Sequence, residues 1–253
     1  MRVRIVVSMA LVCFARLASG QTAAAEIALG DQEHAALHIA SALSHYEAAL
    51  AIDSTNYDAL TKAAHDAVDL GEFNPSSDTR TALYRRAEQY ARRAVAANPG
   101  DPEGHFELAR ALGRSALTKG TREKISYARE VRDQALATLK LAPHHAGALH
   151  ILGEWNAEVM RLNGFSRLIA KKFLGGQIFG EASWDNAQKN LEDAVAADPN
   201  RITHRLDLAA VYVDRGDKAK AIGEYEWIVA APVRDFNDPS YKAEAAAALQ
   251  KLR

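Results

Sequence analysis

The fold is decided by the stretch GALHILGEWNAEVMRLNG (147–164), FSRLIAKKFLGGQIFGEASW (165–184) and DNAQKNLEDAVAADP (185–199). Gly153 and Ala187 have small side chains that let two helix backbones approach, and Leu191 fills the space beside them. Pro199 ends the second helix, because its nitrogen cannot donate the next backbone hydrogen bond. The stretch therefore predicts two closely packed antiparallel helices, separated by an insertion at residues 162–182.

The same arrangement of small and large residues recurs along the chain. The second helix of each pair stops near Asp53, Pro99, Pro143, Pro199 or Pro232, and these helices carry Ala42-Tyr46-Ala49, Ala87-Ala91-Ala94, Val131-Ala135-Thr138, Ala187-Leu191-Ala194 and Ala221-Tyr225-Ile228. First helices begin near Tyr57, Pro102, Ala146 and Ile202, with the pairs Ala63-Ala64, Leu108-Ala109, Leu152-Gly153 and Leu208-Ala209. Helix pairs repeated every 34 residues or so are tetratricopeptide (TPR) repeats. The stops here are wider apart, which predicts insertions in several repeats.

We predict an all-α, TPR-like helical-repeat solenoid of four to five helix pairs over residues 26–253, with the insertion in the fourth pair. The stretch 239–252 is an amphipathic helix that would cap the open end of the stack, as terminal repeats of solenoids do. Two sequence signals support the helix starts, Asp101-Pro102 and Asp238-Pro239, each with a cap residue before a first-turn proline.

Residues 1–20 have the pattern of a secretory signal peptide. A positive start at Arg2 and Arg4 precedes an apolar run at 5–14, and small residues at 18–20 offer a cleavage position, with a second one after residue 25. The run is too short for a helix that crosses a bilayer. Cys13 is the only cysteine, so the cleaved protein would have no disulfide. We expect a periplasmic or secreted protein; the alternative is a membrane anchor formed by an uncleaved N-terminus.

The charge of the chain argues against nucleic acid as a partner. There are 31 basic and 32 acidic residues, and three of the arginines lie in residues 1–20. Without a basic excess, the electrostatic attraction that dominates nucleic-acid binding is missing. The sequence also lacks a Gly-rich phosphate loop, an HExxH motif and a GxSxG elbow. We expect no cofactor and no enzymatic activity, with a hydrolase of unrecognised site as the minor alternative.

The runs ALHILGEW (148–155) and IAKKFLG (169–175), followed by the alanine-rich helix to Asp198-Pro199, resemble the regulator of microtubule dynamics family. The resemblance covers roughly Ala35 to Leu252. It implies a TPR-like interaction domain, often tethered to a membrane, with roles in microtubule association, organelle contact and lipid handling. The export signal marks this chain as an exported, bacterial-type member, which would meet no microtubule. We therefore expect the binding role of the family and not its microtubule binding.

The first helix of each pair is expected to line the concave face of the solenoid. Counting from each helix start predicts a groove of mixed character, with the inward residues Thr61, His65, Phe106, Arg110, Arg114, His150, Glu154, Leu206, Ala210 and Val213. Such a surface can hold an extended peptide or its carboxylate. The leading hypothesis is a non-catalytic scaffold that captures a partner protein or peptide. Alternatively, Arg110 and Glu154 pair with neighbours and the aliphatic residues are ordinary packing.

The insertion supports a second hypothesis, a lipid-binding module at an envelope membrane. On a helix, an apolar face with a lysine beside it would be formed by Phe165, Leu168, Ile169, Lys172 and Phe173. A basic amphipathic helix can rest on an anionic membrane. In this hypothesis Phe106 also contacts acyl chains, and Arg110 or Arg114 meets the head group. The competing interpretation is a helix that buries its apolar face on the array and leaves its lysines in water.

The histidines near the N-terminus do not predict a metal site. His34 and His38 are four residues apart, as in helical metal-binding pairs, and His45 falls on the same stripe. On one helix, however, His45 would lie about 10 Å beyond His38, too far to share a metal. We expect a solvated polar face there, and His150 is the better candidate for the groove.

Overall fold

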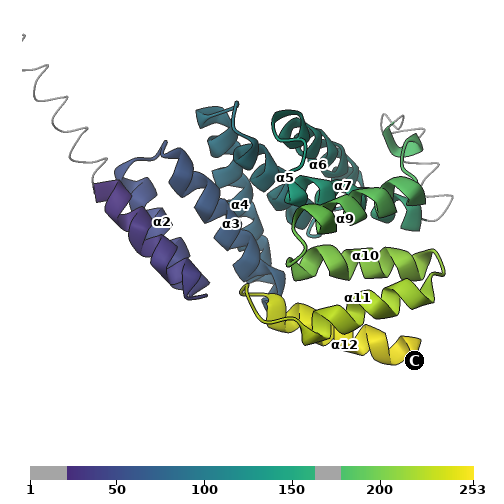
Figure 1. The fold of residues 1–253 in the computed structure, drawn as a ribbon. Helices are drawn as coiled ribbons and strands as arrows, with labels where there is room; N and C mark the ends of the chain where they lie inside the picture. Colours follow the sequence, from purple (N-terminus) through teal and green to yellow (C-terminus); the bar gives the residue numbers. More distant parts are fainter. Residues whose placement is uncertain (1–21, 163–177) are drawn as a thin grey trace, which may run out of the picture.

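The computed structural model describes residues 22–162 and 178–253, which form a curved stack of antiparallel helix pairs (Figure 1). The helix at 22–35 pairs with α2 (Ile39–Ile52), α3 (Tyr57–Glu72) with α4 (Ser77–Ala97), α5 (Pro102–Ala116) with α6 (Thr121–Leu141), α7 (Ala146–Arg161) with α9 (Trp184–Ala197), and α10 (Ile202–Asp214) with α11 (Lys218–Ala230). The short 3-10 helix η1 (Ile178–Gly180) precedes α9, and α12 (Asp238–Leu252) follows the last pair. The predicted all-α, TPR-like solenoid is confirmed.

The helix boundaries agree closely with the sequence pattern. First helices begin at the four predicted residues, and second helices end within two residues of the predicted stops. Repeats two and three are long because α4 and α6 each have 21 residues, so a lengthened second helix explains the wide spacing there. The helix at 22–35 is an addition to the expected elements, since the sequence pattern did not single it out.

The start of α12 differs from the expectation. Asn237 is the residue before the helix, so Asp238 is its first residue and not its cap. The Asp238 carboxylate instead accepts hydrogen bonds from the backbone N–H groups of Arg234 and Asp235, at 2.7 and 2.9 Å. It therefore closes the turn that leads into α12. Asp101 does cap α5 as predicted, by accepting from the N–H of Glu103.

Close packing of α7 on α9 depends on Gly153. A Cβ at this position would lie 2.5 Å from Leu191 Cγ and 3.1 Å from the carbonyl oxygen of Ala187, so a larger residue would push the helices apart. Leu191 is fully buried beside it. A similar close contact between a glycine and a large side chain joins the first pair, where Gly30 faces the ring of Tyr46. The predicted roles of Gly153, Ala187 and Leu191 are confirmed.

Two apolar cores fill the stack. The first extends from the helix at 22–35 to α7 and includes Leu60, Leu112 and Trp155. The second extends from α7 to α12 and includes Leu191 and Ile228. Because α7 contributes to both, the two halves of the array meet along this helix.

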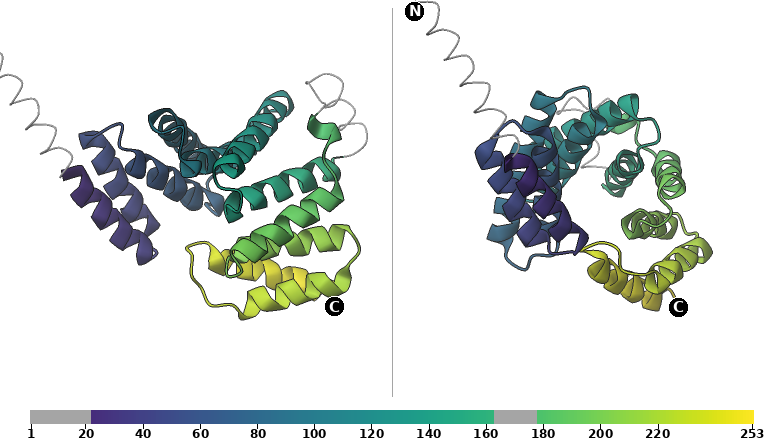
Figure 2. Two further views of the ribbon diagram at one scale, coloured as in Figure 1. Left: turned by 45° about the horizontal axis from the view of Figure 1, so that its top comes forward. Right: turned by 60° about the vertical axis from the view of Figure 1, so that its left-hand side comes forward.

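The array curls until its C-terminal end returns to α3 (Figure 2). Asn237 Nδ2 donates a 3.0 Å hydrogen bond to the carbonyl oxygen of Asp69, across 168 residues of sequence. The ring of Tyr241 meets that of Phe73 edge to face, with centroids 5.1 Å apart. These contacts join the C-terminal part of the array to its second helix pair. Within the described ranges, no helix has the length and apolarity that crossing a membrane requires.

Candidate ligand-binding surface

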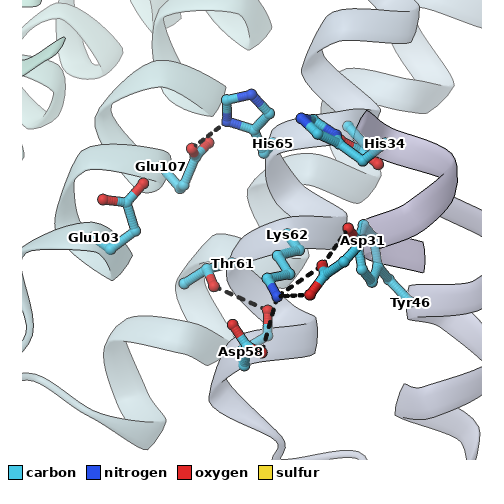
Figure 3. A pocket seen from close by; sticks show the side chains of 10 residues that line it. Asp31, His34, Tyr46, Asp58, Thr61, Lys62, His65, Glu103 and Glu107 are labelled. Atoms are coloured by element: carbon cyan, nitrogen blue, oxygen red, sulfur yellow. Dashed lines mark hydrogen bonds and ion pairs between the residues drawn. The ribbon is translucent and has the colours of Figure 1, made fainter. Parts of the chain in front are cut away.

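A pocket of about 520 Å³ lies where the first three helix pairs meet (Figure 3). This volume is typical of ligand sites in proteins. Its lining comes from the helix at 22–35, from α2, α3 and α5, and consists of Asp31, His34, Tyr46, Asp58, Thr61, Lys62, His65, Asp66, Glu103 and Glu107. Five carboxylates thus face one lysine and two histidines. We call this site the acidic pocket.

Lys62 organises the outer part of the acidic pocket. Its Nζ donates hydrogen bonds to Asp31 Oδ2 at 2.8 Å and to Asp58 Oδ2 at 3.1 Å, and Figure 3 shows the three groups converging. The hydroxyl of Tyr46 donates to the other oxygen of Asp31 at 2.8 Å. One ammonium group therefore pairs with two carboxylates, so the net charge of this part of the pocket wall is negative.

The inner part of the acidic pocket is a buried chain of charges. His65 Nδ1 lies 2.7 Å from Glu107 Oε1, and its Nε2 lies 3.4 Å from Asp69 Oδ2. Arg110 forms an ion pair with Asp69, and its guanidinium donates a hydrogen bond to the carbonyl oxygen of His65 at 3.2 Å. Burial and Arg110 disfavour a charge on His65, but Glu107 and Asp69 outweigh them and raise the pKa of His65 to about 10. His65 is therefore protonated at neutral pH.

Asp66 presents an unpaired oxygen in this setting. Its side chain is only 1% exposed; Oδ1 lies 2.8 Å from His34 Nδ1, while Oδ2 has no hydrogen-bond partner. Burial raises the pKa of Asp66, against the opposing effect of the bond to His34, and the same bond raises the pKa of His34. A buried acceptor without a hydrogen-bond partner destabilises the folded protein. The cost of removing Oδ2 from water is therefore largely met on folding, so a ligand donor that reached Oδ2 would gain a hydrogen bond without meeting that cost again.

The predicted groove residues of α3 and α5 divide between the pocket and the interior. Thr61 and His65 line the acidic pocket. Arg110 is engaged with Asp69, as the alternative interpretation of the sequence held, and Arg114 is engaged with Glu72. Both guanidinium groups are thus neutralised by neighbouring carboxylates.

Phe106 takes part in packing between repeats three and four. Its ring fills the space where a Cβ of Gly147 would lie, and its centroid is 4.6 Å from that of the His145 ring. It also packs against the first apolar core. The side chain is therefore used to join α5 to the start of α7.

His150 and Glu154 come together with a residue that the sequence pattern did not indicate. His150 Nε2 lies 3.9 Å from Glu154 Oε2 on α7 and 3.3 Å from Asp207 Oδ2 on α10. Burial, followed by the fields of Arg114, Arg201 and Arg110, lowers the pKa of His150 to about 3. Burial and Glu154 raise the pKa of Asp207 well above its usual range. We call these three residues the α7–α10 triad.

The remaining predicted residues lie apart from both sites or outside the described ranges. Leu206 packs against the second core, Ala210 is partly buried, and Val213 is 40% exposed. The lipid-contact residues of the insertion fall in the undescribed range 163–177: Phe165, Leu168, Ile169, Lys172 and Phe173.

The helical spacing assumed for the N-terminal histidines does not hold. The chain turns at residues 36–38, where Leu37 has a φ of 62°, so His34 and His38 are not on one helix. His38 Nδ1 lies 3.0 Å from Glu33, and His45 Nδ1 lies 2.8 Å from Glu26. These histidines pair with separate carboxylates.

Most acidic residues of the pocket escaped the sequence analysis for two reasons. Counting inward positions on α3 selected Thr61 and His65 but left out Asp58, Lys62 and Asp66, which flank them on the same helix face. Adding the next residue after Thr61 and after His65 would have found Lys62 and Asp66, and continuing the stripe one turn toward the N-terminus would have found Asp58. The contribution of residues 22–35 was missed because the sequence pattern did not single out a helix there, and His34 was expected on a solvated polar face.

Comparison with known proteins fits this architecture. The family model for regulator of microtubule dynamics protein 1-3 matches residues 14–253. The chain belongs to this family. No sequence among curated proteins matches the chain. Among solved structures, TTC0263, a thermophilic TPR protein of Thermus thermophilus, has a TM-score of 0.64 at 20% identity, over 89% of this chain and 99% of that chain.

A second solved structure agrees. The pilF protein of Pseudomonas aeruginosa has a TM-score of 0.54 at 14% identity, over 93% of each chain. At such identities the likeness shows the fold alone. The regulator of microtubule dynamics domain in this chain is therefore a TPR-like array.

Proposed function

We propose that the protein is a non-catalytic binding module that captures an extended segment of a partner protein on its concave face. A lysine or arginine of that segment enters the acidic pocket. The observation that carries the proposal is this pocket of about 520 Å³, with the buried Asp66 Oδ2 unpartnered in its wall. The TPR-like fold supports the proposal, since stacked helix pairs create extended concave binding surfaces.

The charge of the pocket selects the ligand. Even with His34 and His65 protonated, the five carboxylates exceed the three cations by two. A peptide carboxylate or an anionic head group would be repelled, whereas a basic side chain gains charge-assisted hydrogen bonds. The sequence left a peptide carboxylate or an anionic head group open as ligands of Arg110 and Arg114, but both arginines are paired with carboxylates. For the same reason, no observation on the described residues favours the lipid-binding alternative.

A peptide selection tests the proposal. The full chain is presented with a phage-displayed library of random twelve-residue peptides, and a selected peptide is then titrated by fluorescence anisotropy. We expect selected peptides to contain lysine or arginine. We expect Asp66→Asn to weaken binding by about 10- to 100-fold, the equivalent of one hydrogen bond to a charged group.

Two further variants separate binding from folding. Asp58 and Glu103 are 57% and 47% exposed, so the double variant Asp58→Asn/Glu103→Gln removes pocket charge without disturbing the core. The matched control is Asp193→Asn, an exposed carboxylate on α9 that is remote from the pocket lining. Peptides without basic residues, or wild-type affinity in both pocket variants, would refute the proposal.

We also propose that the protein is exported, with residues 1–20 removed. The positive start, the apolar run and the small residues that follow support this. The test is the intact mass of the protein from the envelope fraction of its own cells. A chain that begins at Gln21 or Glu26 is expected, and a chain that keeps Met1 would contradict the proposal.

A further inference from the structure

The α7–α10 triad is built on α7, the helix that contributes to both apolar cores, and on α10. His150 and Glu154 are one helical turn apart on α7, and Asp207 reaches them from α10, the first helix of the next repeat. The ligand atoms of the three side chains all lie within 4.8 Å of one another. The three groups therefore converge on one point from two helices that belong to different repeats.

The charges of the triad are unbalanced. Among the residues that the structure describes, Glu154 and Asp207 both lie next to His150, and neither has a lysine or arginine within ion-pair distance. Two carboxylates thus lie side by side with no lysine or arginine paired to either, in a place where like charges disfavour each other.

Buried nitrogens near the triad are also incompletely bonded. The ring of His204 lies against that of His150, tilted by 37° with centroids 4.8 Å apart, and Nδ1 of each ring is buried without a hydrogen-bond partner. The side chain of His204 is 5% exposed. Buried polar atoms without partners are rare in folded proteins, and a bound ion or an ordered water is one explanation for them.

The geometry of the triad matches that of a zinc-type site. A tetrahedral ion with ligands at 2.0–2.2 Å needs ligand atoms about 3.4 Å apart. His150 Nε2 lies 3.3 Å from Asp207 Oδ2 and 3.9 Å from Glu154 Oε2, and all three ligand atoms lie within 4.8 Å of one another, so the triad offers three ligand atoms near this spacing. An imidazole with two carboxylates suits zinc and its neighbours in the first transition row, whereas calcium and magnesium prefer oxygen ligands alone.

We propose that His150, Glu154 and Asp207 bind one divalent transition-metal ion of the zinc class. Three protein ligands leave one coordination position for water or for a side chain of a bound partner. The ion ties α7 to α10 and thereby fixes the angle between the two halves of the array. This site does not depend on the acidic pocket or on the proposed peptide binding.

Metal titration tests the proposal. The full chain, without a histidine tag, is depleted of metal and titrated with Zn²⁺ by calorimetry, and Co²⁺ is used as a visible probe because its d–d absorption reports tetrahedral coordination. We expect one ion per chain and a higher Tm in Zn²⁺ than in Mg²⁺ or Ca²⁺. His150→Ala and Asp207→Asn should each weaken Zn²⁺ binding by more than about 10- to 100-fold, the loss seen when only outer-shell partners of a metal ligand are removed.

Matched variants make the result decisive. His38→Gln removes an exposed histidine that contacts a carboxylate elsewhere, that of Glu33, and should leave Zn²⁺ affinity unchanged. Cys13→Ser excludes the only cysteine as a ligand. Asp207→Asn keeps the shape of the side chain, so loss of binding by this variant at unchanged helicity cannot be due to unfolding. Absence of stoichiometric Zn²⁺ binding, or full affinity in His150→Ala and Asp207→Asn, would overturn the proposal.

Discussion

Replacing Gly153 by alanine tests the helix contact on which the fold depends. In a helix interior, alanine is favoured over glycine by about 0.8–1.0 kcal/mol. Here, however, the new Cβ would meet Leu191 Cγ at 2.5 Å and the carbonyl oxygen of Ala187 at 3.1 Å. Neither atom is the free end of a flexible side chain, so the upper part of the overpacking range applies, about 2–3 kcal/mol. We therefore expect Gly153→Ala to lower the free energy of unfolding by about 1–2 kcal/mol.

A double-mutant cycle isolates this contact. Leu191 is fully buried, so Leu191→Ala alone should cost about 2–5 kcal/mol. In that background the methyl group at position 153 enters the space that Leu191 has left, and Gly153→Ala should become neutral or stabilising. The expected coupling between the two substitutions is therefore about 1–3 kcal/mol, well above the error for independent sites.

Urea unfolding followed by far-UV circular dichroism measures these differences. The matched control is Gly113→Ala on α5, where a Cβ would meet nothing within 4 Å, and this variant should gain about 1 kcal/mol. The reasoning is refuted if Gly153→Ala is as stabilising as Gly113→Ala. It is also refuted if the effects of Gly153→Ala and Leu191→Ala simply add.

Two further predictions concern the charged interior and the closure of the array. The pKa of His65 is about 10 in the folded protein and 6.5 in the unfolded chain, so its contribution is complete below pH 6.5 and is lost as the pH rises. Between pH 6.5 and 9 wild type should lose on the order of 3 kcal/mol more than His65→Gln in urea titrations; parallel curves would contradict this. Asn237→Ala leaves the buried carbonyl of Asp69 unpaired, at a cost of about 1–3 kcal/mol. The radius of gyration of this variant, measured by small-angle scattering, should increase. An unchanged radius together with unchanged amide exchange at residues 69–73 would show that the contact between Asn237 and Asp69 does not keep the array curled.

The helix pairs were predictable because their signals are local. Small residues at helical spacing, prolines just beyond helix ends and the cap at Asp101 act over one or two turns, so Tyr57, Pro102, Ala146 and Ile202 could be placed as helix starts. The packing of Gly153 on Leu191 was also predictable, since the two helices of one repeat must bury their apolar faces on each other.

The sites were decided by the tertiary structure. Whether Arg110 faces a ligand or Asp69, and whether Asp207 reaches His150, depends on the small rotation between successive repeats. The return of Asn237 to α3 depends on the sum of these rotations over the whole array. Such rotations arise from side-chain packing between repeats and have no periodic signature, so the sequence by itself determined the repeating helices, while only their stacking decided which charges meet inside the curve.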